Sequence, residues 1–254
     1  MLKTRVMPTL LFKGVGLIKG VGFDSWRRVG AALQSIRVYN LRQVDELVFL
    51  DIGATPGKSK PDFREIDELA DNCFMPMTVG GGVTTLEDIR GLLAVGADKV
   101  AINSGALATP ELIRAGAREF GVQCIVVSID VRRNADGHAE VYSDCGQVSA
   151  KRDPVAWARE VEALGAGEIL LTSVERDGSM SGYDVDLVRD VSSAVNVPVI
   201  ASGGCGCYQH MADVLTNSRA AAVAAASIFH FTEQTPLEAK RYLAERGYRV
   251  RLAS

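Results

Sequence analysis

The chain has 254 residues, 47% hydrophobic and only 6% aromatic, so it can bury a large core of small aliphatic side chains. The formal net charge of −3 excludes the strongly basic field that a nucleic-acid binder needs, and we expect no nucleic-acid partner. The longest apolar runs fall short of the roughly 20 residues that cross a bilayer, and no small-residue cleavage site follows the first residues. We therefore expect a cytoplasmic protein that does not bind membranes.

The cysteines indicate thiols rather than disulfides or a metal site. Their number is odd, and a chain of this size needs no disulfide staples. The five positions are Cys73, Cys124, Cys145, Cys205 and Cys207. Only the last two lie close together, and a zinc site needs three or four ligands. We expect no metal and no cofactor.

Eight short aliphatic runs alternate with longer amphipathic stretches, a pattern typical of a parallel sheet that helices bury on both faces. The predicted strands span residues 5–11, 46–52, 75–80, 99–103, 124–130, 168–173, 197–202 and 221–226. Predicted helices include residues 85–95, 110–120, 154–164, 184–195 and 236–246. Eight such units predict an α/β fold, a single closed (β/α)8 TIM barrel over residues 1–254.

An internal repeat supports the closed barrel. A shift of 122 residues places Glu46 on Glu168 and the turn at 79–83 on the turn at 201–205, and a shift of 119 places 6–11 on 125–130. The repeat predicts two similar half-barrels, at about 1–121 and 122–254. A doubly wound open sheet is the alternative, but it does not explain why the first four strands resemble the last four.

Two glycine clusters follow strands at the carboxyl end of the predicted barrel, where active sites of this fold lie. About twenty residues after each cluster, small polar residues end the next strand. A glycine turn beside a helix N-terminus can bind phosphate, although either cluster alone could simply shape a tight turn. The repetition favours two phosphate sites, and hence a bisphosphorylated substrate. The candidate residues are Gly81, Gly82, Asn103, Ser104, Gly203, Gly204, Ala226 and Ser227.

Other polar residues are expected at the same end of the barrel. Asp177 and Gly178 follow the sixth strand in a loop that can close over a ligand. Lys19, Asp51 and Thr172 follow or end other strands and are candidate substrate contacts.

One candidate catalytic carboxylate, Asp130, ends the fifth strand, where partial burial suits general acid or base chemistry. An aspartate at a strand end can also simply cap a loop. The repeat places Leu11 at the equivalent position of the first half. A barrel that transfers protons on both sides of a substrate would carry a carboxylate at each position, so the leucine is the most informative departure in the chain.

Four charged residues, two of each sign, begin strands at the opposite end. Because side chains alternate along a strand, Arg5 faces the same way as Leu11, and Lys99 the same way as Asn103. If these residues point inward, they form a ring with Glu46 and Glu168, and burial requires that the charges pair. The ring either stabilises the floor of the barrel or acts as a gate for a small polar molecule.

From near residue 1 to about residue 251 the chain resembles the cyclase subunit of imidazole glycerol phosphate synthase. The matching segments are DELVFLDI (45–52), VGGGV (79–83), GADKVAIN (96–103), GAGEILLTS (165–173) and ASGG (201–204). The resemblance implies a TIM barrel, a bisphosphate substrate and a glutaminase subunit that docks on the floor and sends ammonia past a four-charge gate. It places Asp98 and Gln123 at the glutaminase contact, and it matches Asp130 to the second of two catalytic aspartates, while Leu11 stands at the first.

The segments PTLLFKGVGLIKG (8–20) and IRVYNLRQVDELVFLD (36–51) are more similar to paralogues found with surface-polysaccharide genes, which are thought to supply ammonia for amidating a sugar. Our leading hypothesis is therefore an ammonia-using subunit whose acceptor is a bisphosphorylated or nucleotide-sugar molecule other than the imidazole precursor. The second is a conventional cyclase subunit of histidine biosynthesis, in which Asp51 replaces the absent aspartate. The third is a catalytically silent partner that activates a glutaminase.

Overall fold

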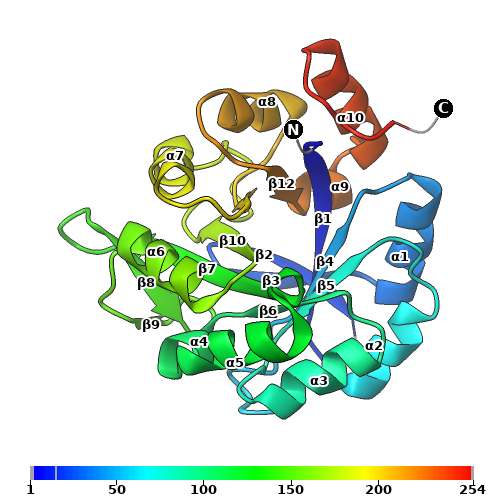
Figure 1. Ribbon diagram of the computed structural model, residues 1–254. Helices are drawn as coiled ribbons and strands as arrows, with labels where there is room; N and C mark the ends of the chain where they lie inside the picture. Colours follow the sequence, from blue (N-terminus) through cyan, green and yellow to red (C-terminus); the bar gives the residue numbers. More distant parts are fainter. Residues whose placement is uncertain (1–2, 15, 253–254) are drawn as a thin grey trace.

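The computed structural model describes residues 3–14 and 16–252. Eight parallel strands pair in a closed ring, because β12 pairs with β1 and β7 pairs with β10 (Figure 1). Around the ring, the strands are β1 (Arg5–Phe12), β4 (Leu47–Asp51), β5 (Met77–Gly80), β6 (Lys99–Ile102), β7 (Ile125–Arg133), β10 (Glu168–Ser173), β11 (Val199–Ser202) and β12 (Ala222–Ala225). The predicted (β/α)8 barrel is confirmed.

Helices connect successive strands and surround the barrel. They are α1 (Ala32–Leu41), α2 (Phe63–Ala70), α3 (Leu86–Ala94), α4 (Ser104–Ala108), α5 (Glu111–Phe120), α6 (Pro154–Leu164), α7 (Val185–Ala194), α8 (Tyr208–Thr216), α9 (Ser227–Phe231) and α10 (Pro236–Glu245). Polar N-caps fix several starts: Thr85 forms a capping box with Asp88, and Asp153 caps α6 ahead of Pro154. None of the helices in the described part of the chain is long and apolar enough to span a membrane.

Two antiparallel hairpins that were not predicted extend from the first and fifth barrel strands. They are built from β2 (Leu17–Val21) with β3 (Asp24–Gly30), and from β8 (Ala139–Ser143) with β9 (Val148–Ser149). The tips touch, because a Cβ on Gly146 would lie 3.1 Å from the ring of Phe23. Each half of the barrel therefore sends a hairpin over the same end.

The strand prediction at 124–130 was wrong at both ends. Cys124 lies in a single 3-10 turn, η1 (Val122–Cys124), and β7 continues to Arg133 because it pairs with β8. All five cysteines are free thiols.

The barrel interior is layered. The side chains that point into the barrel form an apolar cluster of their own, separate from the core between the strands and the helices. The members of the inner cluster are Met7, Val48, Ala101, Val126, Leu170, Ile200, Ala222 and Ala224. Alternate strands contribute to alternate layers in this fold, so the inner cluster separates the two ends of the barrel. Chemistry at the two ends is therefore insulated by aliphatic side chains.

A buried lysine ties the last helix to the first strand. The ammonium of Lys240 lies 2.9 Å from Asp45 Oδ1 and 2.6 Å from the carbonyl oxygen of Gln43, and the side chain is 1% exposed. The second carboxylate oxygen of Asp45 accepts the backbone N–H of Val6 at 3.1 Å. This network joins α10, the segment before β4, and the start of β1.

Replacing Lys240 with methionine should lower the free energy of unfolding by about 3–5 kcal/mol, because it leaves the carboxylate of Asp45 buried without its cation. Urea denaturation measures the effect, with Arg189→Met as the control, since Arg189 forms exposed ion pairs on α7. The double variant Lys240→Met/Asp45→Asn should recover part of the loss. Equal unfolding midpoints for Lys240→Met and wild type would contradict the assigned role.

Candidate active site

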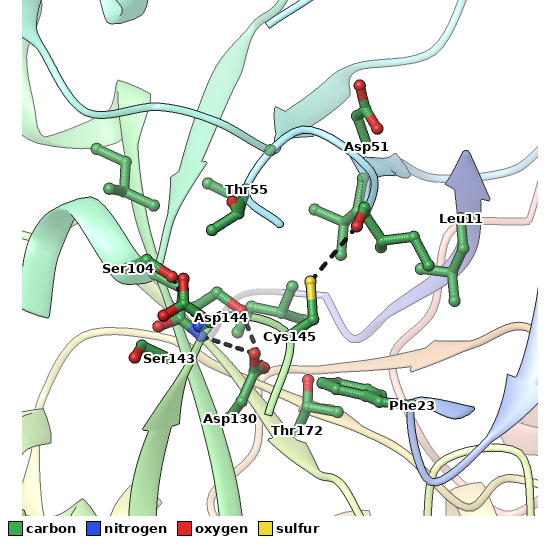
Figure 2. A pocket seen from close by; sticks show the side chains of 18 of the residues that line it. Leu11, Phe23, Asp51, Thr55, Ser104, Asp130, Ser143, Asp144, Cys145 and Thr172 are labelled. Carbon is green, nitrogen blue, oxygen red and sulfur yellow. Dashed lines mark hydrogen bonds between the residues drawn. The ribbon is translucent and has the colours of Figure 1, made fainter. Parts of the chain in front are cut away.

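A cavity of about 840 Å3 opens at the carboxyl ends of the barrel strands. Both halves line it, and Figure 2 shows Leu11 and Asp51 on one side and Asp130, Ser104 and Asp144 on the other. All of the predicted substrate residues lie around this opening. Those that line the cavity are Lys19, Asp51, Gly81, Gly82, Asn103, Ser104, Asp130, Thr172, Asp177, Gly178, Gly203, Gly204, Ala226 and Ser227.

Asp130 is a buried carboxyl at the edge of this cavity. The side-chain amide of Asn103 donates to one oxygen at 2.6 Å, and the hydroxyl of Ser128 lies 3.5 Å from the other. Burial raises the pKa of Asp130 to about 7, and the nearby charge of Asp177 adds to the increase. A carboxyl that titrates near neutrality can both donate and accept a proton under physiological conditions.

The wall that includes Leu11 is apolar. Leu11 is opposite Leu50 of β4 in the parallel ladder and opposite Ile18 of β2 in the antiparallel one. The same cavity is lined by Phe23 and Trp26 from the β2–β3 hairpin. None of these side chains exchanges a proton.

Asp51 is held by the turn that follows β4. Its Oδ1 accepts the backbone N–H groups of Gly53 at 2.9 Å and Ala54 at 3.2 Å, so it fixes the turn after β4. Burial raises the pKa of Asp51, although these two hydrogen bonds oppose the increase. In Figure 2 its carboxylate points away from Asp130.

The two glycine clusters form matching corners of the cavity. Gly81 and Gly204 have φ angles of 119° and 107°, and a Cβ on either would lie within about 2.2 Å of a backbone oxygen. Helices α4 and α9 begin beside these turns, at Ser104 and Ser227. The hydroxyl of Ser227 is buried and has no hydrogen-bond partner in the described part of the chain. Phosphate binding at the corners remains a prediction.

The two corners differ in one respect. At the first, the hydroxyl of Ser104 accepts the backbone N–H of Asp144 at 3.0 Å, so the β8–β9 turn lies directly beside it. The carboxylate of Asp144 also lines the cavity. An anion at the first corner would be repelled by this carboxylate unless the turn moved aside.

Lys19 and Asp177, both predicted to contact substrate, bind each other. Their charged groups lie 2.6 Å apart, and the residue Lys19 is 2% exposed. The backbone of Asp177 also accepts the N–H of Gly22, whose own carbonyl accepts from Arg132 at 2.9 Å. Gly178 allows the close approach, since a Cβ there would lie 2.1 Å from the carbonyl oxygen of Gly20. These residues hold the β2–β3 hairpin over the cavity.

Sequence reasoning missed the residues that the hairpins bring to the cavity. They include Phe23, Trp26, Asp144 and Cys145. Burial and the neighbouring Asp130 raise the pKa of Cys145 to about 11, so it is a protonated thiol at neutral pH. The Asp136-Gly137 pair lies in the turn between β7 and β8, and this hairpin signal could have revealed strand β8.

The predicted charge pairing at the floor is confirmed. Arg5 Nη1 lies 2.7 Å from Glu46 and 2.9 Å from Glu168, and Lys99 Nζ lies 2.8 Å and 3.1 Å from the same two carboxylates. Thr78 donates a further hydrogen bond to Glu46 at 3.0 Å. Burial alone would raise the pKa of Glu46, but Arg5 and Lys99 lower it below its ordinary value. The four charges close a ring.

The interior above this ring is closed as well. Met7, Val126 and Ile200 are fully buried, and the cavity extends down only as far as the layer that contains Ala101 and Leu170. A molecule that moved from floor to cavity would have to separate the ion pairs and displace aliphatic side chains. A gate function for the ring remains a prediction.

The floor also carries exposed residues. The predicted contacts Asp98 and Gln123 are exposed there, and the carboxylate of Asp98 accepts the backbone N–H of Met77 at 2.8 Å. Two large apolar side chains accompany them: Leu41 is 83% exposed and Phe74 is 85% exposed. A protein partner on this surface remains a prediction.

The raised pKa of Asp130 makes stability depend on pH. Its ordinary value is near 3.8, so between about pH 4 and pH 7 the unfolded chain releases a proton that the folded chain retains. Wild type should therefore lose about 2 kcal/mol of stability relative to Asp130→Asn between pH 5 and pH 8. Urea unfolding at several pH values measures the difference. A constant difference across this range would show that the carboxyl titrates normally.

Comparison with known families agrees with this architecture. The model of a family described as "Histidine biosynthesis protein" matches residues 7–235. The match covers the eight barrel strands except the first two residues of β1, together with both glycine corners and Asp130. With its (β/α)8 barrel and its cavity at the carboxyl ends of the strands, the chain belongs to the histidine biosynthesis protein family.

Proposed function

We propose that this chain is an ammonia-using synthase or lyase subunit that receives ammonia from a glutaminase and transfers its nitrogen to a phosphorylated acceptor other than the imidazole precursor. The observation that carries the proposal is the asymmetry of the cavity. One side holds a buried carboxyl, Asp130, and the equivalent place on the other side holds Leu11 in an apolar wall.

This asymmetry determines which reactions the site supports. Asp130 can take the proton that an attacking ammonia loses, or give a proton to a departing oxygen, because its pKa is about 7. A ring closure that needs a second acid or base across the substrate would lose a factor of about 10²–10⁴. Amidation of a sugar needs one such group at the reacting carbon, which fits a paralogue that serves surface-polysaccharide synthesis.

The floor supports the glutaminase part of the proposal. Alternating charges surround the barrel axis there, and Leu41 and Phe74 offer exposed apolar area. A docked glutaminase would cover these side chains together with Asp98 and Gln123. Its ammonia would enter at the ring, where Lys99 and Arg5 hold the two glutamates.

A second candidate function follows from the closed interior. The ring is fully paired and the layer above it is packed, which is also what a catalytically silent activator of a glutaminase would show. The hypothesis of a conventional cyclase depends on Asp51 as a substitute acid. The hydrogen bonds that Asp51 accepts from Gly53 and Ala54 argue against that role.

The acceptor can be tested with labelled nitrogen. The purified chain, [15N]ammonium and a pool of sugar phosphates and nucleotide sugars should give a 15N-labelled sugar product by mass spectrometry. The same chain should form no imidazole glycerol phosphate from the aminoimidazole ribonucleotide. Label that appeared only in imidazole glycerol phosphate would refute the altered acceptor. If no product is labelled, and the chain stimulates glutamine hydrolysis when the glutaminase and glutamine are added, the silent activator is supported instead.

Substituting Leu11 tests whether the missing carboxylate limits imidazole formation. Leu11→Asp should raise the rate of imidazole glycerol phosphate formation by about 10²-fold or more, because it restores an acid or base opposite Asp130. Leu11→Asn is the matched control, since it has the same size but exchanges no proton. Equal rates for the two variants would mean that the other parts of the site no longer accept the ribonucleotide.

The ring can be tested in the complex with the glutaminase. Lys99→Ala leaves Glu46 and Glu168 with Arg5 alone, so glutamine hydrolysis should continue while less of the released nitrogen reaches the product. The ratio of product nitrogen to glutamine hydrolysed measures the coupling, and Arg114→Ala, which removes an exposed ion pair on α5, is the control. An unchanged ratio would limit the ring to a structural role.

A further inference from the structure

One carboxylate that lines the cavity has no partner in the protein. The cavity-lining carboxylates belong to Asp51, Asp130, Asp144 and Asp177. Three of them accept hydrogen bonds or form an ion pair, as described above. In the part of the chain that the structure describes, the carboxylate of Asp144 does neither, and only its backbone N–H is hydrogen bonded. A charged group that faces a cavity in this way is free to interact with a ligand.

The turn that carries Asp144 is fixed in place. The backbone N–H of Asp144 donates to the hydroxyl of Ser104 at the first glycine corner, at 3.0 Å. The thiol of the next residue, Cys145, donates to the carbonyl oxygen of Ile52 at 3.5 Å. The tip of the turn also packs against the β2–β3 hairpin. The carboxylate is therefore held beside the first corner and does not swing freely in solvent.

The cations that line this part of the cavity are bound elsewhere or exposed. Lys60 Nζ lies 3.4 Å from the carboxylate of Asp88, and Arg152 Nη1 lies 2.7 Å from that of Glu160. Lys58 is exposed, so water and salt screen its charge. Within the described residues, none of these cations forms an ion pair with the carboxylate of the turn. The charge that the fold fixes at this corner is therefore negative.

Hydroxyl groups suit such a corner better than phosphate does. An ionised carboxylate only accepts hydrogen bonds, so it repels phosphate oxygens and attracts O–H groups. The hydroxyls of Thr55, Ser104 and Ser143 line the same cavity, and Figure 2 shows Ser104 and Ser143 next to Asp144. A sugar hydroxyl donates and accepts at once, so it matches a mixture of carboxylate and hydroxyl partners.

We infer that Asp144 is a specificity-determining residue, which excludes phosphate from the first corner and accepts hydrogen bonds from sugar hydroxyls there. The inference rests on the proposed function and names its acceptor class. The acceptor is a sugar that carries phosphate at one end only, bound at the second corner, with free hydroxyl groups at the first. A sugar with phosphate at both ends is rejected, because one phosphate would face an unpaired negative charge.

Inorganic phosphate tests the exclusion without knowledge of the acceptor. Crystals of the full chain soaked in phosphate should show it at the second corner and not at the first. Asp144→Asn should admit it at the first corner as well, because the amide removes the charge at constant size. Asparagine also tolerates the left-handed backbone of this position, where φ is 48°.

The control for net charge is Asp136→Asn, which changes an exposed residue outside the cavity and should bind phosphate like wild type. Three results would overturn the inference: phosphate at the first corner of wild type, phosphate at neither corner of wild type, or phosphate at the second corner alone in Asp144→Asn.

Paired sugar phosphates test the hydroxyl part. In calorimetric titrations, wild type should bind at least one of glucose, mannose and galactose 1-phosphate about 10-fold more tightly than the corresponding 1,6-bisphosphate. Asp144→Asn should lose this preference, and Asp136→Asn should keep it. Tighter binding of UDP-glucose than of glucose 1-phosphate would identify the sugar as part of a nucleotide sugar.

Wild type that bound none of the three monophosphates, or that bound each pair with equal affinity, would overturn the inference. Neither experiment contains ammonia or a glutaminase. Failure of the labelled ammonium reaction would therefore refute the proposed function alone.

Discussion

The interior of a closed eight-stranded barrel is too narrow for bulk water, and every second side chain of every strand must point into it. Each inward position therefore has to be aliphatic, paired with a partner, or exposed at an open end. The chain uses all three solutions in order: charges that pair at the floor, an aliphatic layer above them, and polar groups where the cavity begins. Thr9 Oγ1 is an exception within the described residues, because it is buried and has no hydrogen-bond partner there.

The same constraint explains why the two halves of the barrel can differ at one point without changing the fold. Leu11 and Asp130 occupy equivalent places at the ends of β1 and β7, and each packs against its own hairpin. Neither residue shapes a turn, unlike the glycines of the two corners, where a Cβ would collide with backbone. The corners must therefore stay alike, while the acid positions are free to diverge with the chemistry.

Much of this arrangement could be predicted from the sequence. The eight strands are aliphatic runs bounded by turn residues, and strand alternation was enough to place Arg5 and Lys99 on the same interior face. The pairing of Lys19 with Asp177 could not be predicted, because it joins residues 158 positions apart through a hairpin that has no strong turn signal. The raised pKa of Asp130 could not be predicted from the sequence either, since it depends on burial of the carboxyl in the folded barrel.

The floor, the ring and the last helix are mechanically connected. Asp45 accepts the N–H of Val6 and binds Lys240 of α10, and it is the direct neighbour of Glu46. Thr4, one residue before Arg5, pairs with Val250 beyond α10. A partner that shifted α10 or the segment after it would therefore pull on the residues that flank both Arg5 and Glu46. Because the ring is closed by short ion pairs, a small displacement of either residue is enough to weaken it. Under the proposed function, docking on the floor would therefore act on the ring through Asp45 and Thr4.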